Sequence, residues 1–433
     1  MRVITALDVY ANGRLAGELL RHFDAEQKSE FYSFQYDKDA DPENPISLFM
    51  PFREKPYYSN HLHTVFQSSL PEGYLRKAII KRFSKIVYPD DMGILFITGQ
   101  NRIGHLQCME KGKSPARELF NLEMPEYDRD NEADISQHIE KLMMDFAEQS
   151  GVSGTMPKIM STQTECVTIN SKSRIIKLDS TILPFVSVNE FFCLLAARKS
   201  GMTVPDAELI MEGRGISIKR FDITDTKHRL GFEDICSLLG LSNEFRYNAT
   251  SEQLARAVVI AIGNDEDVKH DAMSRLFKST VFSHASRNGD AHLKNYGILF
   301  DGYKSAQLSP IYDLVTTTAF PQLAEDKPAL KLNNQDDWVT KDDFILSGKN
   351  SYGLSNKEME SVFLDVECGL NATASDIVSF FDQSRPQEAL NMMISVLHSW
   401  ETGLSSLEMK TDHIKEALER LDVSHQNNIA ASP

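Results

Sequence analysis

The first residues of the chain alternate between apolar and polar side chains, which is the pattern of half-buried β-strands. Residues 4–10 (ITALDVY) and 14–20 (RLAGELL) flank Asn12-Gly13, and this dipeptide favours the positive φ angles of a two-residue hairpin turn. Two further elements are expected nearby: a strand at residues 45–51 (PISLFMP) and a helix within residues 68–83 that is entered through Pro71 and Glu72. The pattern therefore predicts a small β-rich subdomain at the start of the chain.

Downstream, the pattern changes from strands to helices. Residues 106–135 are polar and charged, which is typical of a linker. Residues 150–222 combine a glycine-containing loop, short strands and one helix at 188–199. Beyond residue 230 the apolar spacing is helical, with helices expected at 251–262, 270–285, 387–400 and 410–421. We therefore predict an α+β protein with parts at residues 1–105, 106–225 and 226–433, the last of them largely helical.

Composition narrows the class of protein. The chain of 433 residues has 41% hydrophobic and 25% charged residues, close to the averages for soluble globular proteins, and it is long enough for several subdomains. No apolar run is long enough to span a bilayer, so we expect no membrane partner. The cysteines are scattered and form no C-x-x-C pair, which argues against a disulfide framework or a zinc knuckle and favours the cytoplasm. They are Cys108, Cys166, Cys193, Cys236 and Cys368.

The formal net charge of −16 bears on possible partners. Affinity for nucleic acid comes largely from Lys and Arg side chains that neutralise phosphates, so this acidic chain is poorly suited to bind DNA or RNA alone. Any contact with DNA is expected to come through a basic partner.

Two acids and an amide in residues 288–315 (NGDAHLKNYGILFDGYKSAQLSPIYDLV) have the order that protein kinases use. Phosphoryl transfer needs a carboxylate near the attacking hydroxyl and oxygen ligands for Mg²⁺, and kinases supply them with an Asp, an Asn five positions later, and a second Asp after a hairpin. Asp290, Asn295 and Asp313 reproduce this order. The segments YGILF and AQLSPIY between them are strand-like and Asp301-Gly302 is a good turn, so a hairpin is expected to bring Asp313 back beside Asn295. The alternative for each residue alone is a structural role at a loop or strand end, which short polar side chains favour.

Two basic side chains lie inside the same motif. His292 and Lys294 could place positive charge near a transferred phosphoryl group, and structural support of the loop is the alternative. Asp290 and His292 could also be zinc ligands, but a closed zinc site needs four ligands and no second cluster with suitable spacing follows.

The segments NGDAHLKN and LSPIYDLV resemble the catalytic and metal-binding segments of HipA-type serine/threonine kinases, the toxins of bacterial type II toxin–antitoxin systems associated with persistence. The resemblance implies an atypical two-lobed protein-kinase-like fold that uses ATP and Mg²⁺. It implies that Asp290 is the catalytic base or the residue that orients the acceptor hydroxyl, while Asn295 and Asp313 hold Mg²⁺ against the ATP phosphates. The HRD and DFG motifs of ordinary protein kinases are absent, and Asp313 is followed by Leu314-Val315.

Upstream, residues 173–180 (SRIIKLDS) place Lys177 in an apolar strand. By itself this is most simply an edge-strand lysine, but the resemblance implies that Lys177 contacts ATP. Glu190, near the start of the following helix, could pair with this lysine as in other kinases, or could simply be an acid favourably placed at a helix N-terminus.

Residues 216–222 (ISIKRFD) have the alternation of a partly buried strand that ends at a turn-forming Asp. The segment resembles the family's strand into the hinge between kinase lobes. The resemblance implies that backbone groups near Arg220 and Phe221 contact adenine and that Asp222 binds the ribose of ATP.

The loop at residues 150–158 (SGVSGTMPK) contains two glycines, which permit close backbone approach to phosphate, but it lacks the spacing of a Walker A motif. It resembles the family's S-G-x-x-P-K loop, so Ser153, Gly154 and Lys158 are implied ATP-binding residues. A serine in this loop can be autophosphorylated in the family, which would repel the ATP phosphates. Ser150 and Ser153 are the two candidates.

The family relationship implies a function and partners. The expected protein phosphorylates a serine in a translation-related protein, with glutamyl-tRNA synthetase as the family precedent, and is self-inactivated by autophosphorylation. The expected partner is a HipB-type helix-turn-helix antitoxin, through which the complex contacts operator DNA and co-represses its operon. Two alternatives remain: a corepressor module with weak or lost kinase activity, and a kinase that acts on a small molecule, because acceptor specificity lies outside the phosphoryl-transfer residues.

Overall fold

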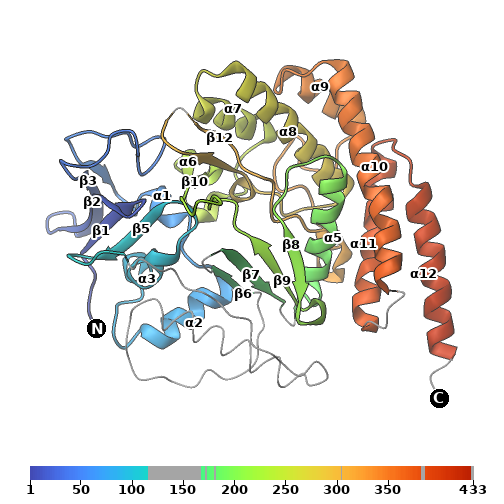
Figure 1. Ribbon diagram of the computed structural model, residues 1–433, viewed down its shortest axis with the longest axis horizontal. Helices are drawn as coiled ribbons and strands as arrows, with labels where there is room; N and C mark the ends of the chain where they lie inside the picture. The colour runs from blue at the N-terminus through green and yellow to red at the C-terminus, as the bar shows by residue number, and fades with distance from the viewer. Residues whose placement is uncertain (116–166, 171–172, 180–181, 304, 382–385, 431–433) are drawn as a thin grey trace. The chain divides into compact units, whose positions relative to one another are not determined.

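The computed structural model describes residues 1–115, 167–170, 173–179, 182–303, 305–381 and 386–430 (Figure 1). The chain divides into two units, each assembled from segments that are distant in the sequence. Unit 1 comprises Met1–Ile182, Ser217–Arg246 and Gly297–Ser309. Unit 2 comprises Leu183–Ile216, Tyr247–Tyr296 and Pro310–Pro433.

Unit 1 contains most of the described strands. Its strands are β1 (Ala6–Ala11), β2 (Arg14–Asp24), β3 (Ser29–Tyr36), β4 (Tyr57–Ser59), β5 (Leu106–Glu110), β6 (Val167–Asn170), β7 (Arg174–Leu178), β10 (Gly231–Asp234), β11 (Gly297–Phe300) and β12 (Gln307–Leu308). Its helical elements are α1 (Thr64–Gln67), α2 (Gly73–Phe83), α3 (Asp91–Thr98), α6 (Ile235–Leu238) and the 3₁₀ turns η1 (Gly99–Asn101) and η3 (Asn243–Phe245).

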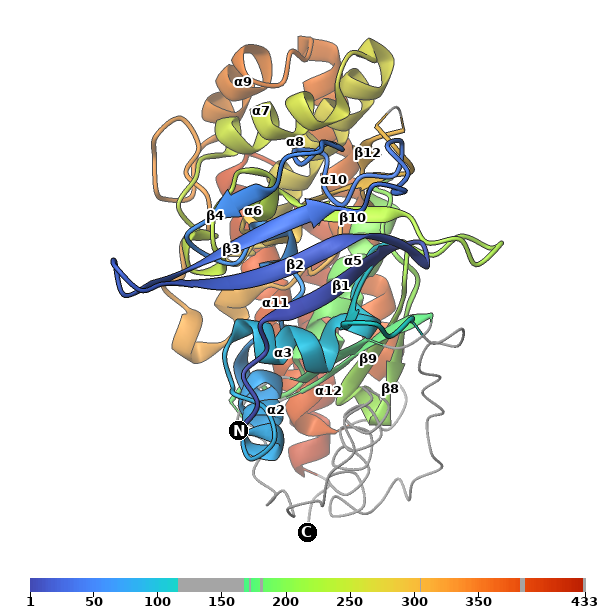
Figure 2. The same cartoon turned by 90° about the vertical axis from the view of Figure 1, so that its left-hand side faces the viewer.

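The predicted N-terminal hairpin is confirmed. β1 and β2 pair antiparallel across the turn, where Asn12 and Gly13 have φ angles of 49° and 75°. They lie in a five-stranded sheet of order β4-β3-β2-β1-β5, whose neighbouring strands are visible side by side in Figure 2. Alternate residues of these strands, such as Leu7, Val9 and Leu19, lie in a hydrophobic core that the helices of this region also line. The alternation seen in the sequence is therefore the inward face of this sheet.

The strand predicted at residues 45–51 is wrong, because this segment is a succession of bends and turns. Its backbone groups are satisfied by side chains instead of a neighbouring strand. The N–H of Ile46 donates to the phenol oxygen of Tyr36 at 3.0 Å, and the N–H of Leu48 donates to the carboxylate of Glu233 at 3.3 Å. Four apolar residues between two prolines resemble a short strand in sequence, but tertiary partners decided the backbone here.

Two smaller sheets follow. The three-stranded sheet has the order β10-β11-β12, and β11 pairs antiparallel with β12 as predicted for the segment after Asn295. The four-stranded sheet has the order β6-β7-β9-β8. The division between the units falls within β9 (Gly215–Lys219), and β8 (Ala207–Ile210) belongs to unit 2.

Unit 2 is largely helical, as expected for the end of the chain. Its helices are α5 (Val186–Lys199), α7 (Ser251–Ile262), α8 (Glu266–Ala285), α9 (Lys341–Asn350), α10 (Asn356–Phe381), α11 (Gln387–Ser406) and α12 (Asp412–Ala430). Its 3₁₀ turns are η2 (Met211–Gly213), η4 (Leu293–Asn295), η5 (Thr317–Ala319) and η6 (Pro321–Leu323). The five helices predicted in this region are confirmed, although α8, α11 and α12 extend beyond the predicted limits.

Local sequence explains where the helices before the catalytic motif begin and end. α7 begins with a capping box, in which the side chains of Thr250 and Gln253 exchange hydrogen bonds with each other's backbone N–H, and it ends at Gly263 with a φ of 86°. The N-cap of α8 is Asp265, whose side chain accepts from the N–H of Val268. These signals fix where α7 ends and where α8 begins, and α8 continues to Ala285, shortly before the residues of the candidate site.

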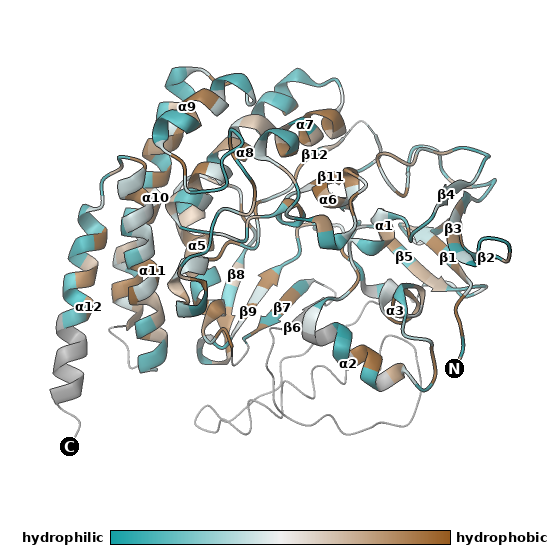
Figure 3. Ribbon diagram, turned by 180° about the vertical axis from the view of Figure 1, so that it is seen from behind, coloured by the Kyte–Doolittle hydropathy of each residue, from teal (hydrophilic) through white to brown (hydrophobic). Residues whose placement is uncertain are grey.

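The core of unit 2 is made by the apolar sides of these helices, which appear as brown bands beside teal ones in Figure 3. Phe277 of α8 packs edge-on against Phe344 of α9 and Phe363 of α10. Trp400 of α11 is fully buried, and its Nε1 donates to the hydroxyl of Thr316 at 2.8 Å. The α+β class, with a β-rich first part and a helical last part, is therefore confirmed. Among the described residues, no helix combines the length and apolar character needed to cross a membrane.

One buried acid in unit 1 makes stability depend on pH. Burial raises the pKa of Glu233 from 4.5 to about 7, although hydrogen bonds from Ser47, Ser237 and Leu48 oppose the rise. Because the folded chain prefers the protonated form, the stabilising contribution of this group is complete below its unfolded pKa and is lost as pH rises through about 7. We expect Glu233→Gln to remove this loss, so that the variant gains stability relative to the parent between pH 4.5 and pH 7.5 in urea unfolding. Glu26→Gln, at an exposed acid, is the control, and parallel pH curves for Glu233→Gln and the parent would contradict the expectation.

Candidate functional site

The loop that carries Asp290 is held by its own backbone. After α8 the chain turns sharply at Arg287, whose φ of 54° lies in the left-handed region. The N–H of Gly289 then donates to the hydroxyl of Thr317 at 2.9 Å, and the N–H of Asp290 donates to the side-chain oxygen of Asn288 at 3.0 Å. A Cβ on Gly289 would lie 2.4 Å from a carboxylate oxygen of Asp326, so glycine is required here. The loop therefore presents Asp290 on a fixed backbone.

The side chain of Asp290 is half exposed and has close neighbours within unit 2. The hydroxyl of Tyr247 donates to its Oδ1 at 2.6 Å. The Nε2 of His292 lies 3.9 Å from the same oxygen, and the rings of Tyr247 and His292 meet edge to face with centroids 5.0 Å apart. Tyr247 was missed by sequence reasoning, because it precedes the motif by more than forty residues and belongs to no pattern.

Asn295 connects the two predicted aspartates. Its side-chain Nδ2 donates to the backbone carbonyl of Asp290 at 3.1 Å and to that of Asp313 at 3.4 Å. Asn295 is buried, and its Oδ1 accepts no hydrogen bond from the described residues. The three residues that the sequence singled out are therefore brought together, and one amide oxygen is left for another ligand.

Asp313 occupies an unusual backbone conformation. Its φ of 60° is left-handed, a conformation that costs a non-glycine residue about 1–3 kcal/mol and tends to occur at functional sites. The neighbouring Tyr312 donates its hydroxyl to the backbone carbonyl of Lys294 at 2.6 Å, which holds this segment against the catalytic loop. The backbone of Lys294 is thereby held beside Tyr312.

These residues fit a magnesium ion that is bound mainly by nucleotide. No group of three His, Cys, Asp or Glu side chains suited to a metal occurs among the described residues. Mg²⁺ does not need one, because it is usually held by one or two protein oxygens together with waters and substrate phosphates. The Oδ1 of Asn295 and the carboxylate of Asp313 could serve as oxygen ligands of that kind.

The predicted nucleotide contacts in unit 1 that the structure describes lie in β7 and in the residues that follow β9. Lys177 is half-buried in β7 between the buried Ile176 and Leu178, and it is opposite Thr168 of β6. Glu190, its possible partner, is buried in α5 of unit 2. The roles of both residues stay predictions.

Arg220 and Asp222 form a buried ion pair. The Nε and Nη2 of Arg220 donate to the two carboxylate oxygens of Asp222 at 3.0 and 2.5 Å, and the N–H of Gly104 donates to Oδ2 at 2.8 Å. Burial alone would raise the pKa of Asp222, but the charge of Arg220 and these hydrogen bonds hold it below its ordinary value. Sequence reasoning did not anticipate this pair. The contact of Asp222 with ribose stays a prediction. Such a contact would use a carboxylate oxygen that already accepts a hydrogen bond from Arg220 or from both Arg220 and Gly104.

Of the remaining predicted positions, the structure describes only Phe221. Phe221 follows β9 and packs against Phe232, with ring centroids 5.7 Å apart. Four predicted residues of the glycine-containing loop lie outside the described residues, namely Ser150, Ser153, Gly154 and Lys158.

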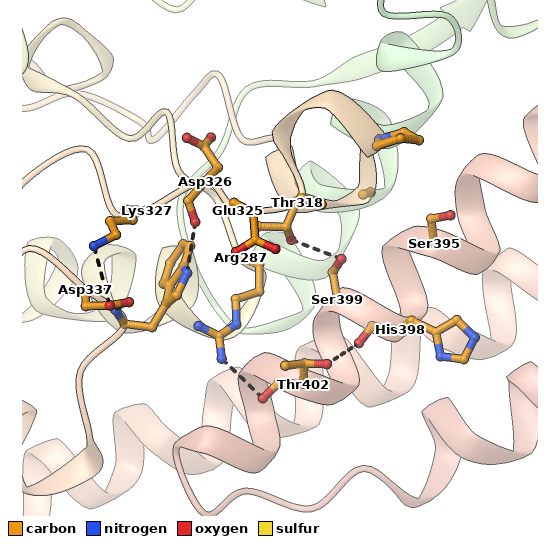
Figure 4. Close-up of a pocket in the computed structure, with 14 residues that line it drawn as sticks. Arg287, Thr318, Glu325, Asp326, Lys327, Asp337, Ser395, His398, Ser399 and Thr402 are labelled. Atoms are coloured by element: carbon orange, nitrogen blue, oxygen red, sulfur yellow. Dashed lines mark hydrogen bonds and ion pairs between the residues drawn. The ribbon is translucent and has the colours of Figure 1, made fainter.

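A pocket of about 620 Å³ lies within unit 2 beside the segment that follows Asp313 (Figure 4). Thr318 donates to Ser399 of α11 at 3.0 Å across this pocket, and Arg287 lies over the ring of Trp338 with its guanidinium carbon 4.6 Å from the ring centroid. The pocket adjoins the catalytic loop, because one of its lining residues, Asp326, is the neighbour that Gly289 accommodates. Sequence reasoning found no motif beyond residue 320, and the pocket is formed only by packing.

Comparisons with known proteins place this site in a family. The family model for the HipA-like C-terminal domain matches residues 150–374, and that for the HipA N-terminal domain matches residues 7–109. From Sinorhizobium fredii, the protein named "Putative kinase Y4dM" is 29% identical over 37% of this chain and 41% of its own length. "Putative kinase Y4mE" from the same organism is 25% identical over 77% of this chain and 82% of its own length.

A solved structure supports the fold. A chain in the complex of HipA, HipB and operator DNA from the toxin–antitoxin system of Shewanella oneidensis MR-1 is 17% identical to this chain, with a TM-score of 0.66. The match covers 95% of this chain and 99% of the other. Since the C-terminal domain match alone covers more than half of the chain and includes Asp290, Asn295 and Asp313, the chain belongs to the HipA family.

Proposed function

We propose that this protein is an ATP- and Mg²⁺-dependent serine/threonine kinase of the HipA toxin type. The observation that carries the proposal is the Asn295 amide, which joins the backbone carbonyls of Asp290 and Asp313 and so holds together the segments that carry the proposed base and the proposed metal ligands. Two relatives carry the word kinase in their names, and the chain shares a fold with a protein solved in complex with HipB and operator DNA.

Each residue has a definite part in the proposed reaction. Bound Mg²⁺-ATP would supply the γ-phosphoryl group, with ADP as the leaving group. Asp290 would orient the acceptor hydroxyl and take its proton, while Asn295 Oδ1 and the carboxylate of Asp313 would hold the metal ion. Lys177, Lys158 and the glycine-containing loop contact the phosphates, and His292 and Lys294 add positive charge beside them.

The proposed partner and the proposed regulation rest on the family to which the chain belongs and on its net charge. An antitoxin of the HipB type is the proposed partner, because the solved relative was found with HipB and operator DNA. A chain with a net charge of −16 needs such a basic partner to reach an operator. Phosphorylation of Ser150 or Ser153 would inactivate the enzyme by repelling the ATP phosphates. The proposed substrate is a serine in a translation-related protein such as glutamyl-tRNA synthetase.

The acceptor is proposed to dock at the pocket beside Asp326. The pocket adjoins the loop of Asp290, and its walls include the residues that directly follow the metal-binding segment. It carries carboxylates at Glu325 and Asp337 as well as the cation of Arg287, so it suits a polar protein segment more than an apolar one.

Incubation of the purified protein with Mg²⁺ and ATP, followed by mass spectrometry, tests the kinase proposal. We expect phosphate on the peptide that contains Ser150 and Ser153 in the parent, and none in Asp290→Ala or Asp313→Ala, because these variants lack the base or a metal ligand. Asp336→Ala, at an exposed acid outside the pocket lining, is the matched control and should label like the parent.

The outcomes separate the candidate functions. Full labelling of either aspartate variant would refute the assigned mechanism. If ATP binds but neither this loop nor any added protein is labelled, the corepressor role with lost kinase activity becomes the better account. Labelling of small molecules alone would indicate a small-molecule kinase.

Filling the pocket tests acceptor docking separately. Ser395 lines the pocket from α11, and its hydroxyl bonds only the carbonyl of Asn391 one turn earlier. We expect Ser395→Trp to raise the KM for a protein acceptor at least about tenfold, because the loss of even 1.4 kcal/mol of binding has this effect. The KM for ATP should not change. Ser379→Trp is the matched control, since Ser379 makes the same helical bond on α10, is exposed and lies outside the pocket lining. An unchanged acceptor KM in Ser395→Trp would place docking elsewhere.

A further inference from the structure

The side chain of Tyr247 contacts Asp290, the candidate base, and no sequence motif predicts this contact. It follows η3 and lies three residues before Thr250, the cap of α7. Its hydroxyl donates to Oδ1 of Asp290 at 2.6 Å, a length typical of a strong hydrogen bond to a charged acceptor. The capping box after Tyr247 fixes the backbone from which this phenol reaches the loop.

The surroundings of the phenol restrict how it can move. Its ring packs edge to face against His292, two residues after the base, with centroids 5.0 Å apart. The Nε2 of His292 is 3.9 Å from Oδ1, which is too long for a hydrogen bond. His292 therefore supports the tyrosine ring, while the tyrosine hydroxyl holds the carboxylate.

The base needs such support, because its side chain is about half exposed. An exposed aspartate can adopt several staggered rotamers, and those that turn away from the acceptor do not contribute to the reaction. Catalytic groups must be held close to their productive geometry, since small misplacements cost large factors in rate. A hydrogen bond to Oδ1 from a fixed ring selects one orientation of the carboxylate.

We infer that Tyr247 is a positioning residue for phosphoryl transfer: its hydroxyl orients the Asp290 carboxylate toward the acceptor hydroxyl. The inference rests on the proposed kinase function. It assigns Tyr247 no contact with ATP or the metal ion, so its loss should affect the rate of transfer and leave nucleotide affinity unchanged.

The test is the rate of phosphoryl transfer by the full chain with Mg²⁺-ATP. This rate is the kcat with a protein acceptor that the parent labels or, when no other acceptor is found, the first-order rate constant for labelling of its own loop, which then takes the place of kcat. We expect Tyr247→Phe to lower kcat about tenfold, which corresponds to the loss of about 1.4 kcal/mol of transition-state stabilisation. The KM for ATP and the urea midpoint should remain those of the parent. Tyr88→Phe is the matched control, because Tyr88 is 46% exposed, close to the 44% of Tyr247, and lies in unit 1 far along the chain from the motif.

A second variant separates the hydroxyl from the ring. If the hydroxyl is what matters, Tyr247→Phe and Tyr247→Ala should lose similar factors in kcat. A purely structural tyrosine would instead leave Tyr247→Phe active and lower both kcat and the urea midpoint in Tyr247→Ala.

Each outcome decides one question. An unchanged kcat in Tyr247→Phe overturns the positioning role. A raised kcat overturns it too, since the phenol would then be competing with the acceptor for Asp290. A parent that labels no acceptor, or an Asp290→Ala variant that stays active, refutes the kinase mechanism itself, and the role of Tyr247 falls with it.

Discussion

The candidate site depends on one side-chain amide. The Nδ2 of Asn295 donates to the backbone carbonyl of Asp290 and to that of Asp313, so two residues twenty-three positions apart share a single donor group. A buried amide whose Nδ2 is used in this way leaves its oxygen as the group available to a cation. The bridge thus connects the proposed base to the proposed metal ligands, and the left-handed backbone at Asp313 is tolerated because the surrounding contacts fix it.

Helices of unit 2 anchor the segment that follows Asp313, next to this bridge. Asn189 of α5 bonds the backbone of Thr316 in both directions, accepting from its N–H at 2.9 Å and donating to its carbonyl at 3.0 Å. The Nε1 of Trp400 in α11 donates a hydrogen bond to the hydroxyl of the same threonine. The hydroxyl of Thr317 accepts a hydrogen bond from the N–H of Gly289. The segment after Asp313 is therefore anchored to two buried helices and to the catalytic loop, which gives exposed functional side chains a rigid support.

Much of the fold followed from local sequence. The Asn12-Gly13 hairpin and the helices of unit 2 were predicted because their signals are local: turn residues, caps and apolar periodicity. The strand expected at residues 45–51 did not form, because the hydroxyl of Tyr36 and the carboxylate of Glu233 satisfy its backbone from distant parts of the chain. No local pattern contains that information.

The sequence by itself determined the order Asp290, Asn295 and Asp313, and the hairpin of β11 and β12 between them, because both are encoded within twenty-four residues. Only the tertiary structure decided that Asn295 bridges two carbonyls, that Arg220 pairs with Asp222, and that Tyr247 holds the base. Side-chain hydrogen bonds of this kind require partners to be a few ångströms apart in space. Segments separated by many residues meet that condition only once the helices and sheets have packed.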